Sequence, residues 1–366
     1  MMVTQDFQPD WVSPPGDTII DLMDEHGISD EELSKKIGLS LDRGQQLLEG
    51  KLRLNPSMAD KLEELFSVST DFWIRREDAY RQQIERIQKT NSDWLESLPV
   101  RDMMEFGWIP RTSTRESKFR HCLSFFGIHS VSEFFHKIHS DAPLIAFRKS
   151  LNLTTEPVAD MVWLTRAEQL SAKQVCAEWN KKALQALLPE LRRATNEPDM
   201  GIFLPHIRQL LATAGVSLIV LPTPRGCRAS GATCFFTPNR ATLVMSFRYL
   251  TDDHFWFTLF HEIGHLILHE AVRVRAEGKE GLTTEEEKEA DKFAVDVLIP
   301  EEYRQQLRRY GVRHWRDIVR TARKMGVSKG IVLGYLQHEG NVPFSHLNRL
   351  KVRFSKEDIV QVQPPK

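Results

Sequence analysis

Two histidines, His261 and His265, stand four residues apart in an otherwise apolar stretch. On an α-helix this spacing places both imidazole rings on one face, where both can bind a single metal ion. Glu262 follows His261 directly, so its carboxylate points beside such an ion rather than at it. That is the position of a general base that activates water in zinc hydrolases. A catalytic zinc site needs three protein ligands, so the chain must supply one more.

The third ligand is expected on a second helix, residues 284–299, which ends before Pro300. Its apolar residues recur at helical spacing and are Ala290, Phe293, Ala294, Val297 and Leu298. At about 100° per residue, Glu286 and Glu287 fall near the centre of that face, and Glu289 falls farther away. A carboxylate on an inward face is costly unless it is paired or binds a metal. We therefore predict Glu287 as the third ligand, with Glu286 and Glu289 as alternatives.

Asp291 lies one helical turn after Glu287, where it can accept the outer N–H of a ligating histidine. A lone HExxH motif occurs by chance in many chains, and its histidines can simply be half-buried on an amphipathic helix. The two acidic residues at the expected positions of a second helix favour a metal site over that interpretation.

The helix that carries the histidines is expected to begin near Asp252 and Asp253. Its apolar stripe comprises Phe255, Leu259, Phe260, Ile263, Leu266 and Ile267. Upstream, residues 216–221, 232–236 and 242–246 have the composition of short strands. We expect a small β-sheet beside this helix in an α+β domain. If residues 242–246 form the edge of the sheet, they can bind an extended substrate by strand addition.

The remaining chain is predicted to be mainly helical. Within residues 1–85, short helical stretches flank a glycine turn at residues 38–40, which is typical of a helix-turn-helix bundle. Residues 86–212 are expected to form a helical middle region, and residues 213–355 the domain that holds the metal constellation. Residues 356–366 are a tail. The predicted fold class is therefore mainly α, with one α+β catalytic domain.

Two segments of the catalytic domain resemble the ImmA/IrrE family of bacterial metallopeptidases, namely FWFTLFHEIGHLILH (255–269) and EKEADKFAVDVLIP (287–300). SGATCFF (230–236) and ARKMGVSKGIVLGYLQHEG (322–340) extend the resemblance, which covers roughly residues 95–355. It implies a zincin-like, gluzincin-type fold and hydrolysis of peptide bonds.

In that family, two histidines and a downstream glutamate bind zinc, and the glutamate after the first histidine is catalytic. The resemblance therefore implies one Zn²⁺ ion held by His261, His265 and Glu287, with Glu262 as the catalytic residue. His269 matches a further histidine that is frequent in the family. We interpret His269, like Asp291, as a residue that supports the ligands from behind.

The N-terminal part resembles the Cro/C1-type helix-turn-helix of HigA-like antitoxins, through PPGDTIIDLMDEHGISDEELSKKIGLS (14–40), LLEGKLRLNPSMADKLEELF (47–66) and STDFWIRREDAY (69–80). The combination implies a regulator of toxin–antitoxin loci or mobile elements. Its expected partners are a repressor-like or antitoxin-like protein substrate, operator DNA, a toxin, and a second copy bound through the N-terminal domain. The alternative is a HigA-like DNA-binding repressor or antitoxin whose metal site is structural or sensory.

The charge of the N-terminal part leaves DNA binding open. Residues 1–80 contain 17 acidic and 8 basic side chains, whereas DNA binding depends on neutralising phosphates. The expected recognition helix and the loop after it offer Arg43, Gln45, Gln46 and Lys51 as DNA contacts. A helix-turn-helix that is retained for protein contacts or dimerisation is the other interpretation.

The composition indicates in which cellular compartment the protein is expected. The four cysteines lack CxxC spacing, so neither a disulfide framework nor a cysteine zinc site is expected. No apolar stretch is long enough to span a membrane, and the first residues lack the pattern of a secretory signal. These features favour the cytoplasm. The basic run at residues 304–323 is interpreted as a solvated helix face.

Overall fold

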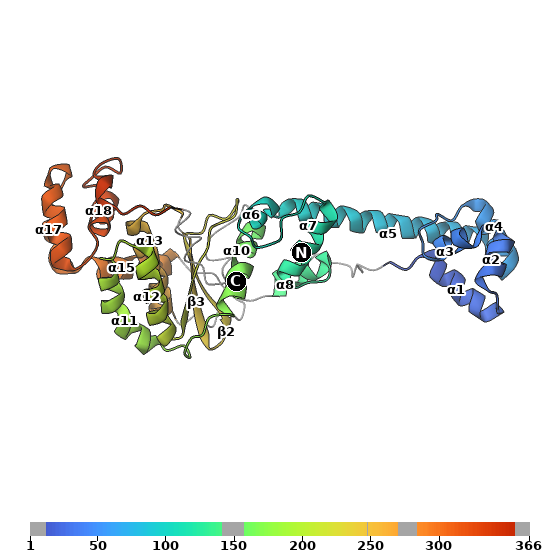
Figure 1. Ribbon diagram of the computed structural model, residues 1–366, viewed down its shortest axis with the longest axis horizontal. Coiled ribbons are helices and arrows are strands. Elements are labelled where there is room, and N and C mark those ends of the chain that lie inside the picture. The colour runs from blue at the N-terminus through green and yellow to red at the C-terminus, as the bar shows by residue number, and fades with distance from the viewer. Residues whose placement is uncertain (1–11, 141–156, 247, 270–283, 356–366) are drawn as a thin grey trace. The chain divides into compact units, whose positions relative to one another are not determined.

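The computed structural model describes residues 12–140, 157–246, 248–269 and 284–355 (Figure 1). Two compact units are present, of which the first comprises residues 1–96 with 129–133 and the second residues 97–128 with 134–366. The described residues are mostly helical with one small sheet, as predicted for a mainly α chain. In this part of the chain, no helix combines the length and apolar character needed to cross a bilayer. The domain limits at residues 85, 212 and 355 stay predictions.

The first unit is built from the helices α1 (Pro15–His26), α2 (Asp30–Ile37), α3 (Leu41–Leu48), α4 (Pro56–Phe66) and α5 (Thr70–Ser97). Ser29, Ser40 and Asn55 cap α2, α3 and α4, because each side chain accepts a backbone N–H three residues on. Gly38, with a φ of 77°, ends α2 and turns the chain into α3. The core of the unit is formed by fully buried side chains, including Ile19, Leu33, Leu62 and Trp73. α2 and α3 are therefore two short helices around a glycine turn.

The helices outside the first unit, with α8 shared between the two, are α6 (Val100–Glu105), α7 (Arg115–Phe126), α8 (Val131–Ser140), α10 (Pro157–Ser171), α11 (Lys181–Ala194), α12 (Met200–Thr213), α13 (Asp252–Leu268), α15 (Thr284–Leu298), α16 (Glu301–Leu307), α17 (Trp315–Met325) and α18 (Lys329–His338). Two short 3-10 helices, η1 (Val312–His314) and η2 (Asn348–Leu350), lie among the last of these. α13 contains His261 and His265, and α15 contains Glu287, so the two helices predicted to hold the site are present.

The sheet of the second unit consists of β1 (Val216–Val220), β2 (Gly231–Thr237) and β3 (Arg240–Met245) in the order β1-β3-β2. β1 pairs with β3 in parallel, and β2 pairs with β3 antiparallel. The three predicted strands are thus confirmed, but residues 242–246 do not meet the condition set for substrate binding, which was that they form a sheet edge. β3 is the central strand, since both of its sides are hydrogen-bonded. Its unbroken run of buried residues is typical of a strand covered on both faces.

α13 packs against β2 and β3 through the stripe predicted from its sequence. Leu259, Phe260 and Ile263 are fully buried in the core of the second unit. Phe203 of α12 lies against the same helix, with its ring centroid 5.5 Å from that of Phe255. Burying this stripe fixes the rotation of α13, and so fixes the direction in which its polar face points.

The first turn of α13 is anchored by two buried carboxylates. Asp252 accepts the backbone N–H of Val352 at 2.9 Å and the hydroxyl of Ser328. The Nζ atom of Lys351 lies 2.6 Å from an oxygen of Asp253, and both side chains are almost fully buried. These contacts tie α13 to segments that follow it by about 75 to 100 residues.

We expect Asp252→Asn to remove part of the pH dependence of stability. Burial raises the pKa of Asp252 to about 6, above an unfolded value of about 4. The protonated carboxyl of Asp252 therefore stabilises the folded state fully below about pH 4. This contribution is lost as the pH rises through 6. The melting temperature of the wild type should therefore fall relative to that of Asp252→Asn between about pH 4 and 7, corresponding to about 3 kcal/mol. A difference between the two that stays constant with pH, measured with metal chelated in both, contradicts this account.

Candidate metal centre

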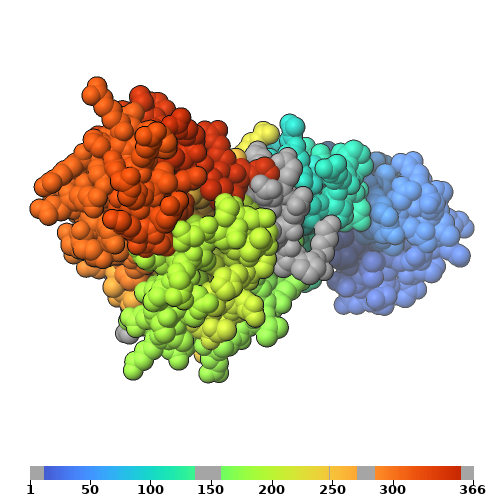
Figure 2. Space-filling view, turned by 60° about the vertical axis from the view of Figure 1, so that its left-hand side comes forward, coloured from blue at the N-terminus to red at the C-terminus, as the bar shows by residue number. Residues whose placement is uncertain are grey.

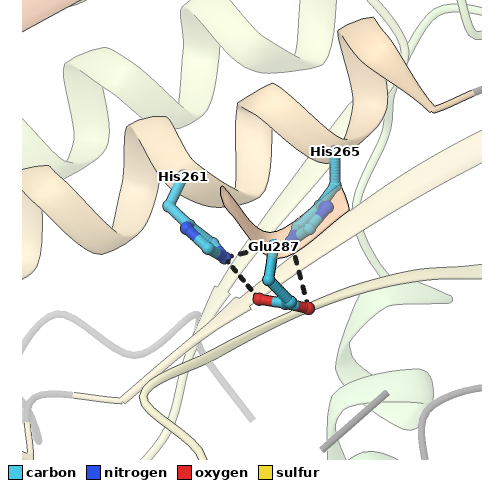
Figure 3. A group of neighbouring side chains, drawn as sticks. All are labelled: His261, His265 and Glu287. Carbon is cyan, nitrogen blue, oxygen red and sulfur yellow. Dashed lines mark hydrogen bonds and ion pairs between the residues drawn. The ribbon is translucent and has the colours of Figure 1, made fainter. Parts of the chain in front are cut away.

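Close packing of α13 and α15 brings the predicted ligands together. Gly264 faces α15, and a Cβ atom there would lie 3.1 Å from a ring carbon of Phe293 and 3.3 Å from the Cα of Ala290. A glycine at this point therefore lets the two backbones approach one another. Glu287, near the start of α15, then lies opposite the imidazoles of His261 and His265 (Figure 3).

The three side chains form a triangle of the size that zinc requires. The Nε2 atoms of the two histidines are 3.0 Å apart. Oxygens of Glu287 lie 3.3 Å from Nε2 of His261 and 3.7 Å from Nε2 of His265. Tetrahedral bonds of about 2.0–2.1 Å separate neighbouring ligand atoms by roughly 3.3 Å. Two imidazole nitrogens and a carboxylate are also a donor set of catalytic zinc.

The structure distinguishes between the three glutamates considered as third ligand. Among the described residues, the only such cluster is His261, His265 and Glu287, whose ligand atoms lie within 4.8 Å of one another. The Glu289 carboxylate instead contacts His269, and Glu286 is outside the cluster.

Electrostatics also favour a cation at this point. Burial lowers the pKa of His261, but hydrogen bonds to Asp291 and Glu287 outweigh it and raise that pKa to about 10. Burial raises the pKa of Glu287, but the two histidines outweigh it and lower that pKa to about 2. The cluster thus stabilises positive charge, which a divalent ion would supply in place of a proton.

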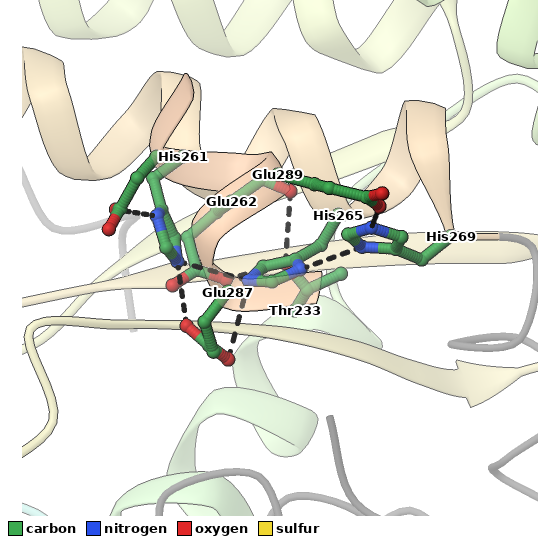
Figure 4. A network of polar contacts seen from close by, with 8 residues as sticks. Thr233, His261, Glu262, His265, His269, Glu287 and Glu289 are labelled. Carbon is green, nitrogen blue, oxygen red and sulfur yellow. Dashed lines mark hydrogen bonds and ion pairs between the residues drawn. The ribbon is translucent and has the colours of Figure 1, made fainter. Parts of the chain in front are cut away.

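The outer nitrogen of each histidine leads to a carboxylate, directly for His261 and through His269 for His265 (Figure 4). Nδ1 of His261 lies 2.8 Å from an oxygen of Asp291, to which it can donate its proton directly. Nδ1 of His265 lies 3.1 Å from Nδ1 of His269, whose Nε2 lies 2.9 Å from an oxygen of Glu289. If His269 donates to Glu289 and accepts from His265, both ligating Nε2 atoms keep a lone pair for the metal. Sequence reasoning placed Asp291 and His269 behind the ligands but missed this role of Glu289.

Removing the end of this chain of hydrogen bonds should weaken metal binding. We expect Glu289→Ala to lower zinc affinity by about 10-fold or more, because outer partners of ligating histidines typically contribute about 10- to 100-fold. Glu289→Gln keeps an acceptor oxygen and should retain most of the affinity. Competition with a chromophoric chelator measures the difference.

The matched control is Glu285→Ala, which removes an exposed carboxylate of the same helix that pairs only with Lys288 among the described residues. If Glu289→Ala binds zinc as tightly as this control, the proposed support of His265 through His269 is absent.

Glu262 lies beside the cluster and is held by β2. Its side chain is buried, and the hydroxyl of Thr233 donates to one carboxylate oxygen at 2.6 Å. A Cβ atom at Gly231 would lie 2.7 Å from the other carboxylate oxygen, so this glycine leaves room for Glu262. The sequence contained both residues in the SGATCFF segment but gave no signal of their role, because the contact joins a strand and a helix about 30 residues apart.

The predicted DNA contacts lie in the first unit. Arg43, Gln45 and Lys51 are exposed, and Gln46 is half-buried. The amide of Gln46 donates to Asp42 at 2.9 Å, and Lys51 pairs with Glu49 at 2.5 Å. Two of the four side chains are therefore already engaged by acidic neighbours.

Comparison with known families tests the catalytic part of the chain. A peptidase family model described as the IrrE N-terminal-like domain was found. It matches residues 230–335. This stretch contains β2, β3, α13, α15 and the four residues of the centre, so the resemblance to ImmA/IrrE metallopeptidases is supported there. The match covers less than half of the chain and does not reach residues 1–85, for which a helix-turn-helix is predicted. A comparison with curated proteins gave no match.

Proposed function

We propose that the protein is a zinc-dependent endopeptidase. The observation that carries the proposal is the triangle of His261, His265 and Glu287 with the buried carboxylate of Glu262 beside it. Three protein ligands leave a fourth position of a tetrahedral ion for solvent or substrate, which is the arrangement of catalytic rather than structural sites. The family match over residues 230–335 supports the same activity. A purely structural or sensory metal site does not require a buried carboxylate beside the ligands, which is what Glu262 provides.

The residues of the chain divide the chemistry between them. Zinc, when bound, supplies a Lewis acid that polarises the scissile carbonyl and lowers the pKa of water to about 7. Glu262 accepts the proton of the attacking water and returns it to the leaving amine nitrogen. Thr233 holds one oxygen of that carboxylate in place. The hydrogen bonds to Asp291 and His269 keep His261 and His265 oriented towards the ion.

We infer that the substrate binds as an extended peptide along β2. Within the described residues, β2 pairs with β3 on one side only. Thr233 of this strand donates to Glu262, and Gly231 leaves room for the same carboxylate, so a peptide added beyond β2 runs close to the general base. Strand addition supplies affinity through main-chain hydrogen bonds and constrains sequence only through side-chain pockets.

We further propose that the substrate is a regulatory protein of the repressor or antitoxin class. The support is the pair of short helices α2 and α3 around Gly38, which resembles the helix-turn-helix of HigA-like antitoxins. On this proposal the first unit binds operator DNA, dimerises or binds a toxin, and the protein acts in the cytoplasm.

Mapping of new N-termini by mass spectrometry tests the proposed activity. A bacterial protein extract is incubated with zinc-loaded protein, with the Glu262→Gln variant, and with protein treated with a chelator. The proposal predicts a small, reproducible set of new N-termini that only the zinc-loaded wild type produces. If the three samples yield the same N-termini, the chain is not an endopeptidase.

A further inference from the structure

A basic surface lies in the last part of the second unit, outside the metal centre. Between Tyr303 and His338 the chain carries nine Lys and Arg residues and a single acidic residue, Asp317. The other residues after position 80 carry 32 basic and 32 acidic side chains. All of the excess positive charge outside residues 1–80 is therefore concentrated in this span. In Figure 2 its orange to red atoms form one side of the second unit.

Five of these nine residues lie on α17 and on η1, the short 3-10 helix that precedes it. α17 buries Ile318, Ala322 and Met325 in the core. The opposite side of α17 exposes Arg316, Arg320, Arg323 and Lys324, and Arg313 of η1 is exposed just before it; we call these five residues the basic face. At about 100° and 1.5 Å per residue, the four side chains of α17 fall within an arc of roughly 100° and along about 12 Å. One strand of duplex DNA presents about three to four phosphates over that length.

The basic face is not neutralised by the protein itself. Arg320 pairs with Asp317 at 3.0 Å, but both side chains are exposed, and such pairs contribute little energy. Within the described part of the chain, Arg313, Arg323 and Lys324 form no ion pair. Their charge is available to an anionic partner.

An aromatic ring pre-orients two of the guanidinium groups. Trp315 is 37% exposed, and the guanidinium carbons of Arg316 and Arg349 lie 5.1 Å and 5.4 Å from its ring centroid. Stacking on an aromatic face restricts these long side chains before any ligand arrives, so less entropy is lost on binding. The planar guanidinium then offers paired N–H donors that match the geometry of a phosphate.

We propose that the basic face binds the sugar-phosphate backbone of nucleic acid without regard to sequence. A row of arginines at helical spacing matches a regular array of phosphates. It matches the irregularly spaced charges of a protein surface less well. The helix-turn-helix region, in contrast, has more than twice as many acidic as basic side chains over residues 1–80. The positive charge that DNA binding requires is thus supplied by the second unit. This surface lies outside the metal centre, and its binding to nucleic acid does not require peptidase activity.

Salt-dependent binding to DNA tests this surface. Fluorescence anisotropy of a labelled 24-base-pair duplex of arbitrary sequence is measured with full-length protein between about 30 and 200 mM salt. The triple variant Arg316→Gln, Arg320→Gln and Arg323→Gln should bind at least 10-fold more weakly at low salt. Its slope of log affinity against log salt should be smaller by roughly two to three, since each lost phosphate contact removes about 0.9.

A charge-matched control uses three exposed arginines elsewhere in the second unit, Arg111→Gln, Arg120→Gln and Arg193→Gln. This variant should bind like the wild type, and all three proteins should share one melting temperature. Equal loss in both triple variants, or no loss in the first, overturns the proposal. Competition by polyglutamate as effective as that by unlabelled duplex, at equal concentration of negative charge, also overturns it in favour of an acidic protein partner.

Discussion

Replacing Glu262 by glutamine is expected to abolish peptide cleavage and to leave the metal in place. The amide is isosteric and can still accept the hydroxyl of Thr233, which now donates to Glu262 at 2.6 Å. It cannot accept a proton from water, and a general base typically contributes about 10²- to 10⁴-fold to the rate. We therefore expect kcat to fall by about 10³-fold while the zinc content stays at that of the wild type. Cleavage assays on a substrate identified by its new N-termini, together with elemental analysis, measure both quantities.

Glu285→Gln provides the control for this experiment, because it makes the same chemical change at an exposed position on α15. This variant should cleave at the wild-type rate. Retention of full activity by Glu262→Gln would remove the general base from the proposed mechanism. Loss of zinc from Glu262→Gln would instead show that Glu262 is needed for metal binding, in conflict with its assigned place beside the ion.

The second large effect is expected from the ligands themselves. His265→Ala or Glu287→Ala leaves two of three protein ligands, so zinc affinity should fall by more than the about 100-fold typical of outer partners. Binding to the folded state alone stabilises it by about 4 kcal/mol at a thousandfold excess over Kd. Zinc should therefore raise the melting temperature of the wild type by several degrees and that of either variant by much less.

His254→Ala and Glu285→Ala are the matched controls for this experiment. His254 is exposed on α13, two turns before the ligands, and Glu285 is exposed on α15. Both variants should respond to zinc as the wild type does. A wild-type zinc response in Glu287→Ala would mean that another group serves as the third ligand.

The parts of the site that sequence reasoning located are those that depend on helix geometry alone. The spacing of His261 and His265 fixes their common face on any helix. The apolar stripe of the second helix fixes which of its carboxylates point inward, and this favoured Glu287 over Glu289. The structure brings Glu287 to the two imidazoles. No knowledge of the rest of the fold was needed for that step.

The parts that sequence reasoning missed depend on how separate elements are placed. Glu289 lies off the inward face of α15, and only the end of α13 brings His269 to it. Thr233 reaches Glu262 because β2 lies beside α13.

The strand order could not be read from local composition either, so the sequence left open whether residues 242–246 form an edge, whereas β3 is the central strand. The burial of Asp252 and Asp253 was also missed, because charged residues in a first helical turn are usually solvated. Their partners lie about 75 to 100 residues later in the chain. In both cases the deciding contacts are long-range.

The most direct test of the account is to locate the metal in crystals of the zinc-loaded protein, using anomalous scattering at the zinc absorption edge. The account predicts a single strong peak about 2.0–2.1 Å from Nε2 of His261, Nε2 of His265 and a carboxylate oxygen of Glu287. A peak bound by Glu289 or Glu286 in place of Glu287, or the absence of any peak between the two histidines in fully loaded protein, would contradict it.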